Sequence, residues 1–579
     1  MGRLPKQPKF YSTLLVAIVV VVTLLFAVLS LTSKPKVEEA KEQPVGMDAW
    51  TIEQSALNGA PLAENKNIYK LDDAGNLDTL YITVFPTKTE NGVLDFSAFD
   101  LHTARDQTYD PTLEANVVQG DKDGRLSPLV NTDVVNASIR VRGNSSRGAL
   151  FKSYKIRFSE EGDNFRGMTV LNLNKHMNDI SKVAQKFCFD LMKDIDNFSS
   201  LRTNFVKVYI RDASLPPEEQ QYRYYGLHTN VEQPNKAYLT AHGLDINASL
   251  YKATQFEFRE SPELKDVDDP AYDEVAFETI LGIREGKDHT KLLNMLRDIN
   301  DMSGNFEENF HKYFNEDNYL TWLAVNILLG NEDTISHNFI LYNPNNSMTW
   351  YLMPWDYDGT FAFGEYKGSF KAPESLRGIQ RMTGVQLHRR YFINPNNIKK
   401  LEAKVEYILN TYFTKERVNG LLEQYKPVLE QTMTLAPDVG VLEMPPNELG
   451  SYLAQFHDVI MNNYRAFVTA LEYPTPVFTS EPQKTDDGVK FAWEASRDFD
   501  NELVKYSIRV ARNYQMTDIV FEADELLSTV YTFKGDLEGD YFMEVKSIDS
   551  SGHRQYSLDS YEDVVDRTFT NGVRKFTIK

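Results

Sequence analysis

The stretch that decides the fold runs from Gly330 to Phe361 and begins Gly-Asn-Glu-Asp-Thr-Ile-Ser-His-Asn-Phe-Ile-Leu-Tyr. A polar turn follows, and the stretch ends Trp-Tyr-Leu-Met-Pro-Trp-Asp-Tyr-Asp-Gly-Thr-Phe. Phe339–Tyr342 and Trp350–Met353 are short apolar runs on either side of Asn-Pro-Asn-Asn, which is a strong turn signal. The sequence therefore predicts a β-hairpin with polar loops at its open end.

The hairpin predicts a cluster of carboxylates beside that open end. Asp333, His337 and Asn338 precede the first strand, and Asp356 and Asp358 follow the second. Three carboxylates and a carboxamide repel one another unless a cation lies among them, and oxygen ligands of this kind suit Mg²⁺ or Mn²⁺. The alternative is that the aspartates only cap turns at the strand ends.

The spacing of two of these residues favours a functional site. Asp333 and Asn338 repeat the Asp-x-x-x-x-Asn of a protein-kinase catalytic loop, in which the Asp orients the acceptor hydroxyl and the Asn binds metal. This spacing alone occurs by chance in many proteins. A hairpin that also delivers Asp356 to the same place makes turn capping the weaker explanation.

The composition of the chain bounds its class. A chain of 579 residues is too long for one core, so two or three domains are expected. The net charge of −21 argues against nucleic acid as a partner. The single cysteine, Cys188, excludes an internal disulfide and lies in an apolar helical pattern, which predicts a buried core thiol.

The N-terminus predicts a membrane anchor. Residues 1–10 carry Arg3, Lys6 and Lys9 and no acidic residue, and Leu14–Leu31 is apolar and uncharged. This is long enough to cross a bilayer, so we predict an uncleaved anchor at 11–33, although a cleaved signal peptide is the alternative. The basic residues stay in the cytoplasm, which places the rest of the chain outside a cell membrane crossed once. Residues 34–65 are predicted to be a linker.

A possible phosphate clamp follows in a β-like region. Strands are predicted at Thr79–Phe85, Asn116–Val118, Asn136–Arg142 and Phe151–Phe158. The last two flank the turn Gly143-Asn144-Ser145-Ser146-Arg147-Gly148, and the second carries Lys155. Backbone N–H groups and guanidinium groups both prefer phosphate oxygens. The turn matches no standard nucleotide motif, and an ordinary hairpin with a solvated basic face remains the alternative.

The middle of the chain is predicted to be mostly helical, after further strands at Phe205–Ile210, Tyr224–Val231 and Leu250–Lys252. The helices are expected at Ser181–Ile195, Lys291–Ile299, Phe306–Leu329, Ile398–Thr432 and Leu449–Leu471. The polar segment Glu365–Tyr391 is predicted to be either a mobile substrate loop or a long surface connection.

A second boundary lies at Pro474 and Pro476. Short predicted strands follow it at Val489–Trp493, Val504–Ala511, Val530–Phe533 and Tyr541–Ile548. Their rhythm predicts that residues 474–579 form a small β-sandwich that resembles a fibronectin type III domain, usually a spacer or binding module.

Taken together, these pieces resemble the CotH family of spore-coat and exported protein kinases, with residues 66–473 as the CotH kinase-like domain. The residues that carry the resemblance are Arg140-Val-Arg-Gly-Asn-Ser-Ser-Arg147, Lys152-Ser-Tyr-Lys-Ile-Arg-Phe158, Tyr225-Gly226, Val231-Glu232-Gln233, Leu250-Tyr251-Lys252, Gly330-Asn331-x-Asp333, His337-Asn338 and Pro354-Trp355-Asp356-Tyr357-Asp358. This chain departs from the family's pattern in the longer segment Arg211–Gln221 and in His228, and both departures are expected to affect the hinge region.

The resemblance implies an α+β, atypical protein-kinase-like fold of two lobes, with a β-rich small lobe, a helical large lobe and ATP between them. It implies transfer of the γ-phosphoryl of ATP to Ser or Thr of an exported or surface protein. On the nucleotide side, the resemblance implies a phosphate loop of Arg142, Gly143, Asn144 and Ser145, a phosphate-binding Lys155 with Lys152 as its rival, and an adenine hinge near Glu232 and Gln233. On the catalytic side, it implies that Asp333 is the catalytic Asp. It implies that Asn338 and Asp356 are ligands of Mg²⁺ or Mn²⁺, with Asp358 as the rival or partner of Asp356.

The sequence therefore predicts a membrane-anchored, outward-facing, metal-dependent protein kinase. Two alternatives remain open. One is a catalytically inactive surface or cell-wall scaffold that keeps the fold, and the other is an enzyme that moves AMP instead of phosphate with the same metal clamp.

Overall fold

The computed structural model describes residues 59–579, apart from residues 91, 102–109, 144, 160–163, 178, 362–371 and 564–567. The predicted anchor at 11–33 lies outside the described residues. Within the described part of the chain, no helix combines the length and the apolar character needed to cross a bilayer. The anchor therefore stays a prediction.

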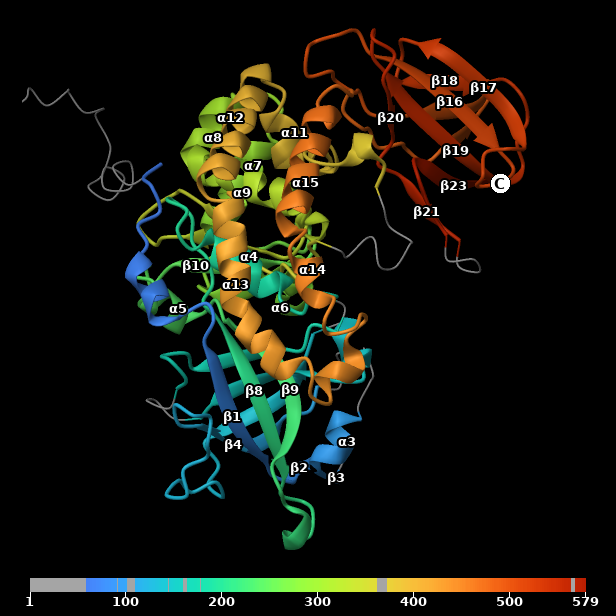
Figure 1. Ribbon diagram of the computed structural model, residues 1–579. Helices are drawn as coiled ribbons and strands as arrows, with labels where there is room; N and C mark the ends of the chain where they lie inside the picture. The colour runs from blue at the N-terminus through green and yellow to red at the C-terminus, as the bar shows by residue number, and fades with distance from the viewer. Residues whose placement is uncertain are drawn as a thin grey trace, which may run out of the picture. The chain divides into compact units, whose positions relative to one another are not determined.

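Seven strands close into a barrel, in the order β1-β4-β5-β6-β7-β9-β8 (Figure 1). Their bounds are β1 Leu77–Val84, β4 Leu113–Gln119, β5 Ala137–Arg142, β6 Ser153–Phe158, β7 Val170–Asn174, β8 Thr203–Asp212 and β9 Arg223–Glu232. Along β5 the buried residues alternate with half-exposed ones, so Ile139 and Val141 face the barrel core while Arg140 and Arg142 face outward. The prediction of a β-rich first lobe is confirmed, and β7 is a strand that the sequence analysis did not identify.

Small elements decorate the barrel. The hairpin β2 (Thr87–Thr89) and β3 (Gly92–Leu94) and the short helix α3 (Phe96–Asp100) follow β1. Helix α4 (Ala184–Met192) follows β7 and is buried along its whole length, which confirms Cys188 as a core thiol. The polar segment Arg211–Gln221 carries η3 (Pro217–Glu219) and joins β8 to β9 at the end of β9 opposite Glu232. The segment therefore lies at the end of β9 away from the predicted hinge residue Glu232, and its effect on the hinge stays a prediction.

A second sheet has the order β11-β10-β12-β13. Its strands are β10 Ser249–Ala253, β11 Leu281–Glu285, β12 Phe339–Asn343 and β13 Tyr351–Pro354. The pair β12–β13 is antiparallel, with Phe339 opposite Pro354 and Tyr342 opposite Tyr351. The predicted hairpin is confirmed, and all residues of both strands are buried.

The described helices between residues 236 and 470 pack beside this sheet and on one another. They are α5 Lys236–Ala241, α6 Glu274–Glu278, α7 Thr290–Asn300, α8 Phe306–Tyr313, α9 Glu316–Leu329, α11 Gln386–Tyr391, α12 Pro395–Thr411, α13 Lys415–Thr432, α14 Leu449–Leu453 and α15 Phe456–Ala470. Helix α9 is buried from Asn318 to Leu329 and packs against α12 and α15. It ends at Gly330, whose left-handed φ of 64° turns the chain into the site.

Three of the predicted helices are each divided in two, which corrects the sequence analysis. The Asn315 side chain accepts a hydrogen bond from the backbone of Asn318 and starts α9, and Thr414 accepts one from Arg417 and starts α13. These are N-cap contacts, which satisfy backbone donors at the start of a new helix. The third break, between α14 and α15, has no side-chain cap.

The segment Glu365–Tyr391 is not a surface connection in its described part. Residues 374–376 and 381–384 form the 3₁₀ helices η5 and η6, and α11 follows directly. Leu376, Ile379 and Val385 are buried in this stretch. Their burial shows that this part of the segment packs into the protein core. Residues 365–371 of the segment lie outside the described part.

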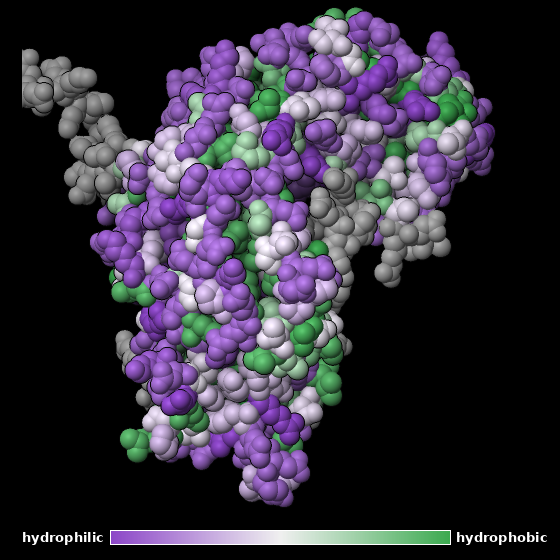
Figure 2. Space-filling view, in the orientation of Figure 1, coloured by the Kyte–Doolittle hydropathy of each residue, from purple (hydrophilic) through white to green (hydrophobic). Residues whose placement is uncertain are grey.

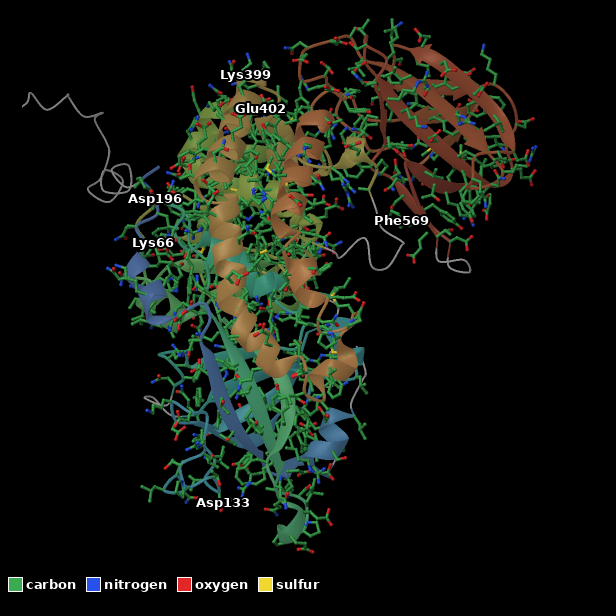
Figure 3. The ribbon with its side chains drawn as sticks, viewed as in Figure 1. Lys66, Asp133, Asp196, Lys399, Glu402 and Phe569 are labelled. Atoms are coloured by element: carbon green, nitrogen blue, oxygen red, sulfur yellow. The ribbon has the colours of Figure 1, made fainter. Side chains whose placement is uncertain are left out.

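The chain before β1 contacts both lobes and is not a free linker, although residues up to 65 were predicted to be one. At one end, Tyr351 donates a hydrogen bond to the Ala60 carbonyl at 2.6 Å. Farther along, Lys66 in η1 (Lys66–Leu71), which is labelled in Figure 3, donates to the Phe198 carbonyl at 2.5 Å. We call residues 59–72 the N-terminal strap.

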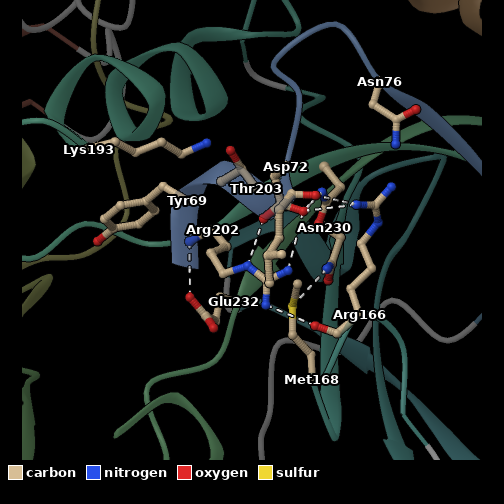
Figure 4. A network of polar contacts seen from close by, with 12 residues as sticks. Tyr69, Asp72, Asn76, Arg166, Met168, Lys193, Arg202, Thr203, Asn230 and Glu232 are labelled. Atoms are coloured by element: carbon tan, nitrogen blue, oxygen red, sulfur yellow. Dashed lines mark hydrogen bonds and ion pairs between the residues drawn. The ribbon is translucent and has the colours of Figure 1, made fainter. Parts of the chain in front are cut away.

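The strap ends in a buried ion-pair network on the barrel (Figure 4). Asp72 pairs with Arg202 at 2.6 Å and with Arg166 at 3.0 Å, and it accepts a further bond from Asn204 at 2.9 Å. The Arg202 backbone N–H donates to the Glu232 carboxylate at 3.0 Å. The network therefore joins the strap to β8, to β9 and to the β6–β7 connection.

A second link between the lobes follows α13, which leads from the other helices to the barrel (Figure 1). Beyond its end, Asp438 in η7 (Asp438–Val441) forms a buried ion pair with Lys175 and accepts from Tyr224 at 2.8 Å. Gly226 has φ 97°, and a Cβ there would lie 2.5 Å from an Asp438 oxygen. Glycine at this position therefore permits the contact.

Residues after 474 form β-sheets, as predicted. One sheet has three strands, β14 Gln483–Thr485, β15 Gly488–Ala492 and β18 Val530–Phe533. The other contains β17 Ile519–Leu526, β16 Lys505–Ala511, β19 Gly539–Ile548 and β20 Arg554–Tyr556, with β23 Val573–Ile578 on β19. A further hairpin pairs β21 Ser560–Glu562 with β22 Phe569–Asn571.

One apolar cluster joins the two larger sheets of this C-terminal region. It includes Phe491 from β15, Trp493 directly after β15, and Ile508, Val545 and Phe576 from the other sheet. The fibronectin type III resemblance stays a prediction, as does the boundary at 474. The surface visible in Figure 2 is mainly hydrophilic, with scattered apolar patches.

Candidate functional site

The loop between α9 and β12 carries Asp333. It lies in the short 3₁₀ helix η4 (Glu332–Thr334) and accepts two hydrogen bonds, at 2.8 Å from His337 Nε2 and at 2.6 Å from Asn338 Nδ2. Asn338 has a left-handed φ of 58°, and its backbone N–H donates to the Ala253 carbonyl at 3.1 Å. The loop thereby holds the Asp333 carboxylate beside the end of the second sheet.

The other end of the hairpin brings back the remaining aspartates. Asp356 follows β13 with φ 60° and accepts a hydrogen bond from Gln185 at 3.0 Å. Burial raises the pKa of Asp358 well above its ordinary value, and the charges of Asp356, Asp179 and Asp333 raise it further. The structure thus gathers Asp333, Asp356 and Asp358 into one carboxylate cluster, as the hairpin predicted.

The cluster has the chemistry of an oxygen-ligated metal site. Among the described residues, no group of three or more His, Cys, Asp and Glu side chains is arranged to hold a metal ion as it stands. The mutual charge repulsion at Asp358 is, however, what a divalent cation relieves. Asn338 and Asp356 lie at the same end of the hairpin, so the residues fit Mg²⁺ or Mn²⁺ by donor type. The assignment of Asn338, Asp356 and Asp358 as ligands stays a prediction.

The barrel directs basic groups at this cluster. Arg142, at the end of β5, is hydrogen-bonded to the Asn174 side chain. Burial lowers the pKa of Arg142, and the charges of Asp356 and Asp358 oppose this change. The arginine from one lobe therefore faces the aspartates from the other.

Lys155 lies on the next strand, among cations. Burial, together with repulsion from Arg140, Arg142 and Arg284, lowers the pKa of Lys155 to about 7. No hydrogen bond or ion pair of its ammonium group is recorded within the described residues. Its rival Lys152 instead donates to the carbonyls of Arg147 at 2.7 Å and Ala149 at 2.9 Å. The geometry thus leaves Lys155 available for a ligand and uses Lys152 to hold the turn.

The predicted phosphate turn is tightly built. Gly143 has φ 90°, and a Cβ there would lie 1.9 Å from Ser146 Oγ, so no other residue fits. Arg147 donates to the Gly143 carbonyl at 2.9 Å and pairs with Asp110 at 2.7 Å. Ser145 begins the 3₁₀ helix η2 (Ser145–Gly148), and Asn144 lies outside the described residues. The turn's role in phosphate binding stays a prediction.

The predicted hinge residues have protein partners. The buried Glu232 carboxylate accepts from His242 at 2.8 Å, in addition to the Arg202 backbone. Gln233 accepts from Asn172 at 3.2 Å. Burial alone lowers the pKa of His242, but hydrogen bonds and charges of Glu232 and Glu64 outweigh it and raise the pKa to about 9. The contact of Glu232 and Gln233 with a nucleotide stays a prediction.

His228, the other departure from the family's pattern, lies within the barrel wall. Its ring is buried and lies 6.2 Å from the ring of Tyr154. Burial lowers the pKa of His228 to about 3, so the ring is neutral at physiological pH. It occupies an aromatic position without adding charge.

Sequence reasoning missed two cations of the site. Lys252 on β10 lies 5.8 Å over the Trp355 ring, and its pKa is lowered by burial and raised by the charge of Asp356. Arg284 lies on β11, and burial lowers its pKa. Lys252 is part of the motif Leu250-Tyr251-Lys252, but the sequence had not indicated a role for this lysine. The alternation Leu281-Gly-Ile-Arg-Glu before Gly286 was a weak strand signal for Arg284.

A cavity of about 340 Å³ opens beside Asp333. Its walls come from the end of α9, from η4, from the segment that carries η5 and η6, and from α15. The polar side chains that line it are Asn326, Asn331, Glu332, Asp333, His337, Arg377, Arg381 and Asn463. No feature of the sequence predicted this cavity, because its walls come from segments far apart in the chain.

Comparison with known proteins matches over half of the chain to a known family. The family model described as CotH kinase protein matches residues 139–443, just over half of the chain. The inner spore coat protein H of Bacillus subtilis (strain 168) is 24% identical over 339 residues, which cover 56% of this chain and 86% of the relative.

A solved structure was also found, the crystal structure of a Helicobacter pylori proinflammatory kinase, CtkA. It is 9% identical, covers 60% of this chain and 95% of its own, and has a TM-score of 0.22, which is too low to inform fold or function. The family match includes Arg142, Lys155, Asp333 and Asp356. By this match, the chain belongs to the CotH kinase protein family.

Proposed function

We propose that this chain is a metal-dependent protein kinase, which transfers the γ-phosphoryl of ATP to Ser or Thr of an exported or surface protein. The observation that carries the proposal is the meeting of opposite charges between the lobes. Arg142 from the barrel faces Asp356 and Asp358 from the hairpin. Membership of the CotH kinase protein family supports the same class of chemistry.

The barrel residues bind and neutralise phosphate. Arg142 presents a guanidinium group to the space beside the carboxylates. Lys155 is close enough to Arg142 for the charge of Arg142 to lower the pKa of Lys155. A bound divalent cation would offset the remaining phosphate charge, held by Asp356, Asp358 and Asn338. Catalysis is then mainly positioning and charge neutralisation.

Asp333 acts on the acceptor side. Its carboxylate is held in place by His337 and Asn338 and is only partly buried, so it can accept a hydrogen bond from an acceptor hydroxyl. The hydroxyl oxygen forms a bond to the γ-phosphorus, the bond from that phosphorus to the leaving ADP oxygen breaks, and the hydroxyl proton passes to solvent. Asp333 orients the nucleophile for this displacement.

The place of action is part of the proposal. The basic residues Arg3, Lys6 and Lys9 before an uncharged apolar run support an anchor with residues 34–579 outside the membrane. Protease added to intact cells should then digest most of the chain. Full protection of the chain behind an intact membrane would refute this orientation.

Labelled ATP separates the kinase from its alternatives. The full chain is incubated with Mg²⁺ or Mn²⁺ and with ATP labelled at either the α- or the γ-phosphate, alone and with co-exported proteins. A kinase transfers only the γ-label, and Asp333→Asn should abolish that transfer. Transfer of the α-label would show AMP transfer, and no transfer by the wild type would favour an inactive scaffold.

A further inference from the structure

In the proposed kinase Asp333 orients the acceptor hydroxyl, so the cavity that Asp333 lines is on the acceptor side. Asp333 and His337 form part of its lining, and α15 and the η5–η6 segment form the opposite walls. A volume of about 340 Å³ is in the range of ligand pockets and exceeds what one small side chain fills. The cavity can therefore hold a side chain of an acceptor segment together with part of its backbone.

Among the described residues of the lining, Arg377 has no acidic partner. Glu332 is paired with Arg381 at 2.9 Å, and Asp333 accepts from His337 and Asn338. Arg377 Nε donates to the Ala372 carbonyl in a long 3.4 Å contact. Within the described part of the chain, its two terminal nitrogens have no recorded partner, so its planar fork is free to bind an anion.

A buried carboxamide in the same cavity also lacks ordinary partners. Asn331 is 2% exposed, and neither its nitrogen nor its oxygen meets hydrogen-bond geometry with any described residue, although the Tyr357 hydroxyl is near. That hydroxyl donates to Asn326 at 2.8 Å. Buried polar groups are usually satisfied, so a carboxamide whose only described neighbour of this kind is the Tyr357 hydroxyl points to a ligand with donors and acceptors, such as a peptide backbone.

The wall that carries Arg377 is fixed by its neighbours. The next residue, Gly378, has φ 60°, and a Cβ there would lie 3.0 Å from the backbone of Phe467 on α15. Gln555 on β20 is fully buried and donates to the Ser375 carbonyl at 2.5 Å. The C-terminal sheets therefore support the turn that presents Arg377.

We propose that this cavity is an acceptor subsite that binds an anionic side chain, a carboxylate or a phosphate, close to the hydroxyl that is phosphorylated. The proposal rests on the kinase function proposed above. Arg377 supplies the charged fork, and Asn331 supplies hydrogen bonds to the backbone of the acceptor segment. The C-terminal sheets act as a support for substrate selection.

Binding without nucleotide tests the subsite independently of catalysis. The probes are fluorescent Ala-based peptides with one central Ser, flanked by Glu, by phosphoserine, by Lys or by Ala. The full chain should bind the Glu and phosphoserine peptides at least about tenfold more tightly than the Ala peptide, as one charged hydrogen-bonded contact provides. Arg377→Gln should remove this preference. Arg465→Gln, an exposed arginine on α15, is the matched control and should keep it.

Transfer of labelled phosphate to the same peptides completes the test, with Arg377→Lys as a variant that keeps the charge in case Arg377→Gln unfolds. Equal use of all four peptides, preference for Lys, or an unchanged preference in Arg377→Gln overturns the subsite. Arg377-dependent binding without any transfer leaves the subsite standing and refutes the kinase. Preference for the phosphoserine peptide alone shows that the subsite recognises a phosphate. Equal preference for the Glu and phosphoserine peptides shows that it recognises negative charge of either kind.

Discussion

The buried imidazole of His242 gives a quantitative prediction. It lies between Glu64 of the N-terminal strap, at 2.7 Å, and Glu232 at the end of β9, at 2.8 Å. None of the three side chains is more than 3% exposed. Replacement of His242 by Gln therefore leaves the buried Glu232 carboxylate without this counter-charge, whereas Glu64 keeps its ion pair with Lys66 at 2.6 Å.

The magnitude follows from the pKa of His242. That pKa rises from 6.5 to about 9 on folding. Each pKa unit corresponds to about 1.4 kcal/mol, so the protonated ring contributes ~3 kcal/mol to the free energy of unfolding. Because the folded-state pKa is raised, this contribution is complete below the unfolded pKa of 6.5 and is lost as pH rises through 9.

Urea unfolding, followed by tryptophan fluorescence, measures this contribution. The difference in unfolding free energy between wild type and His242→Gln should be ~3 kcal/mol larger at about pH 6 than at about pH 10. Comparing the two proteins cancels other groups that titrate, among them Lys155. His311→Gln, at a half-exposed position on α8, should change stability by less than ~0.5 kcal/mol at both values. A difference that does not vary with pH would refute the buried charge on His242.

Three further outcomes are expected. Because the free protein holds Lys155 at a pKa of about 7, binding of metal-ATP near pH 8 should take up a proton, and Lys155→Met should abolish that uptake in calorimetry run in different buffers. Gly226→Ala should lower the unfolding free energy by ~2 kcal/mol or more, because φ is 97° and the added Cβ would clash with Asp438. The control Gly420→Ala on α13 adds a Cβ that meets no other atom and should stabilise the protein slightly. Equal effects of the two substitutions on the unfolding free energy would contradict this. A chain that ends at Leu471 should keep ATP-dependent thermal stabilisation but lose acceptor selectivity, and unfolding of that chain would show one shared core.

The hairpin and its carboxylates could be predicted because their signals are local. A turn of Asn-Pro-Asn-Asn between two apolar runs sets the register, and the register alone returns Asp356 to the neighbourhood of Asp333. The same holds for the alternation of Arg140 and Arg142 along β5. Where a short-range sequence pattern determines the position of a side chain, the sequence was sufficient to predict that position.

Residues that depend on distant packing were not predictable. Arg284 reaches the site only because β11 pairs with β10, and β10 pairs with β12. The strap looked like a linker by composition, yet Glu64 is buried against His242. Helix breaks at Asn315 and Thr414 had readable caps, but the continuous apolar periodicity masked them.

The measurement that most directly tests the site is thermal unfolding with and without Mn²⁺-ATP, for the wild type, Asp333→Asn and Asp356→Asn. The wild type should be stabilised by metal-ATP, and Asp333→Asn should retain this stabilisation while phosphoryl transfer falls by orders of magnitude. Asp356→Asn should weaken metal-ATP binding by about 1–3 kcal/mol, the value of one charged contact. If metal-ATP does not stabilise the wild type, or if both variants bind it equally, the assigned division between acceptor and metal sides is wrong.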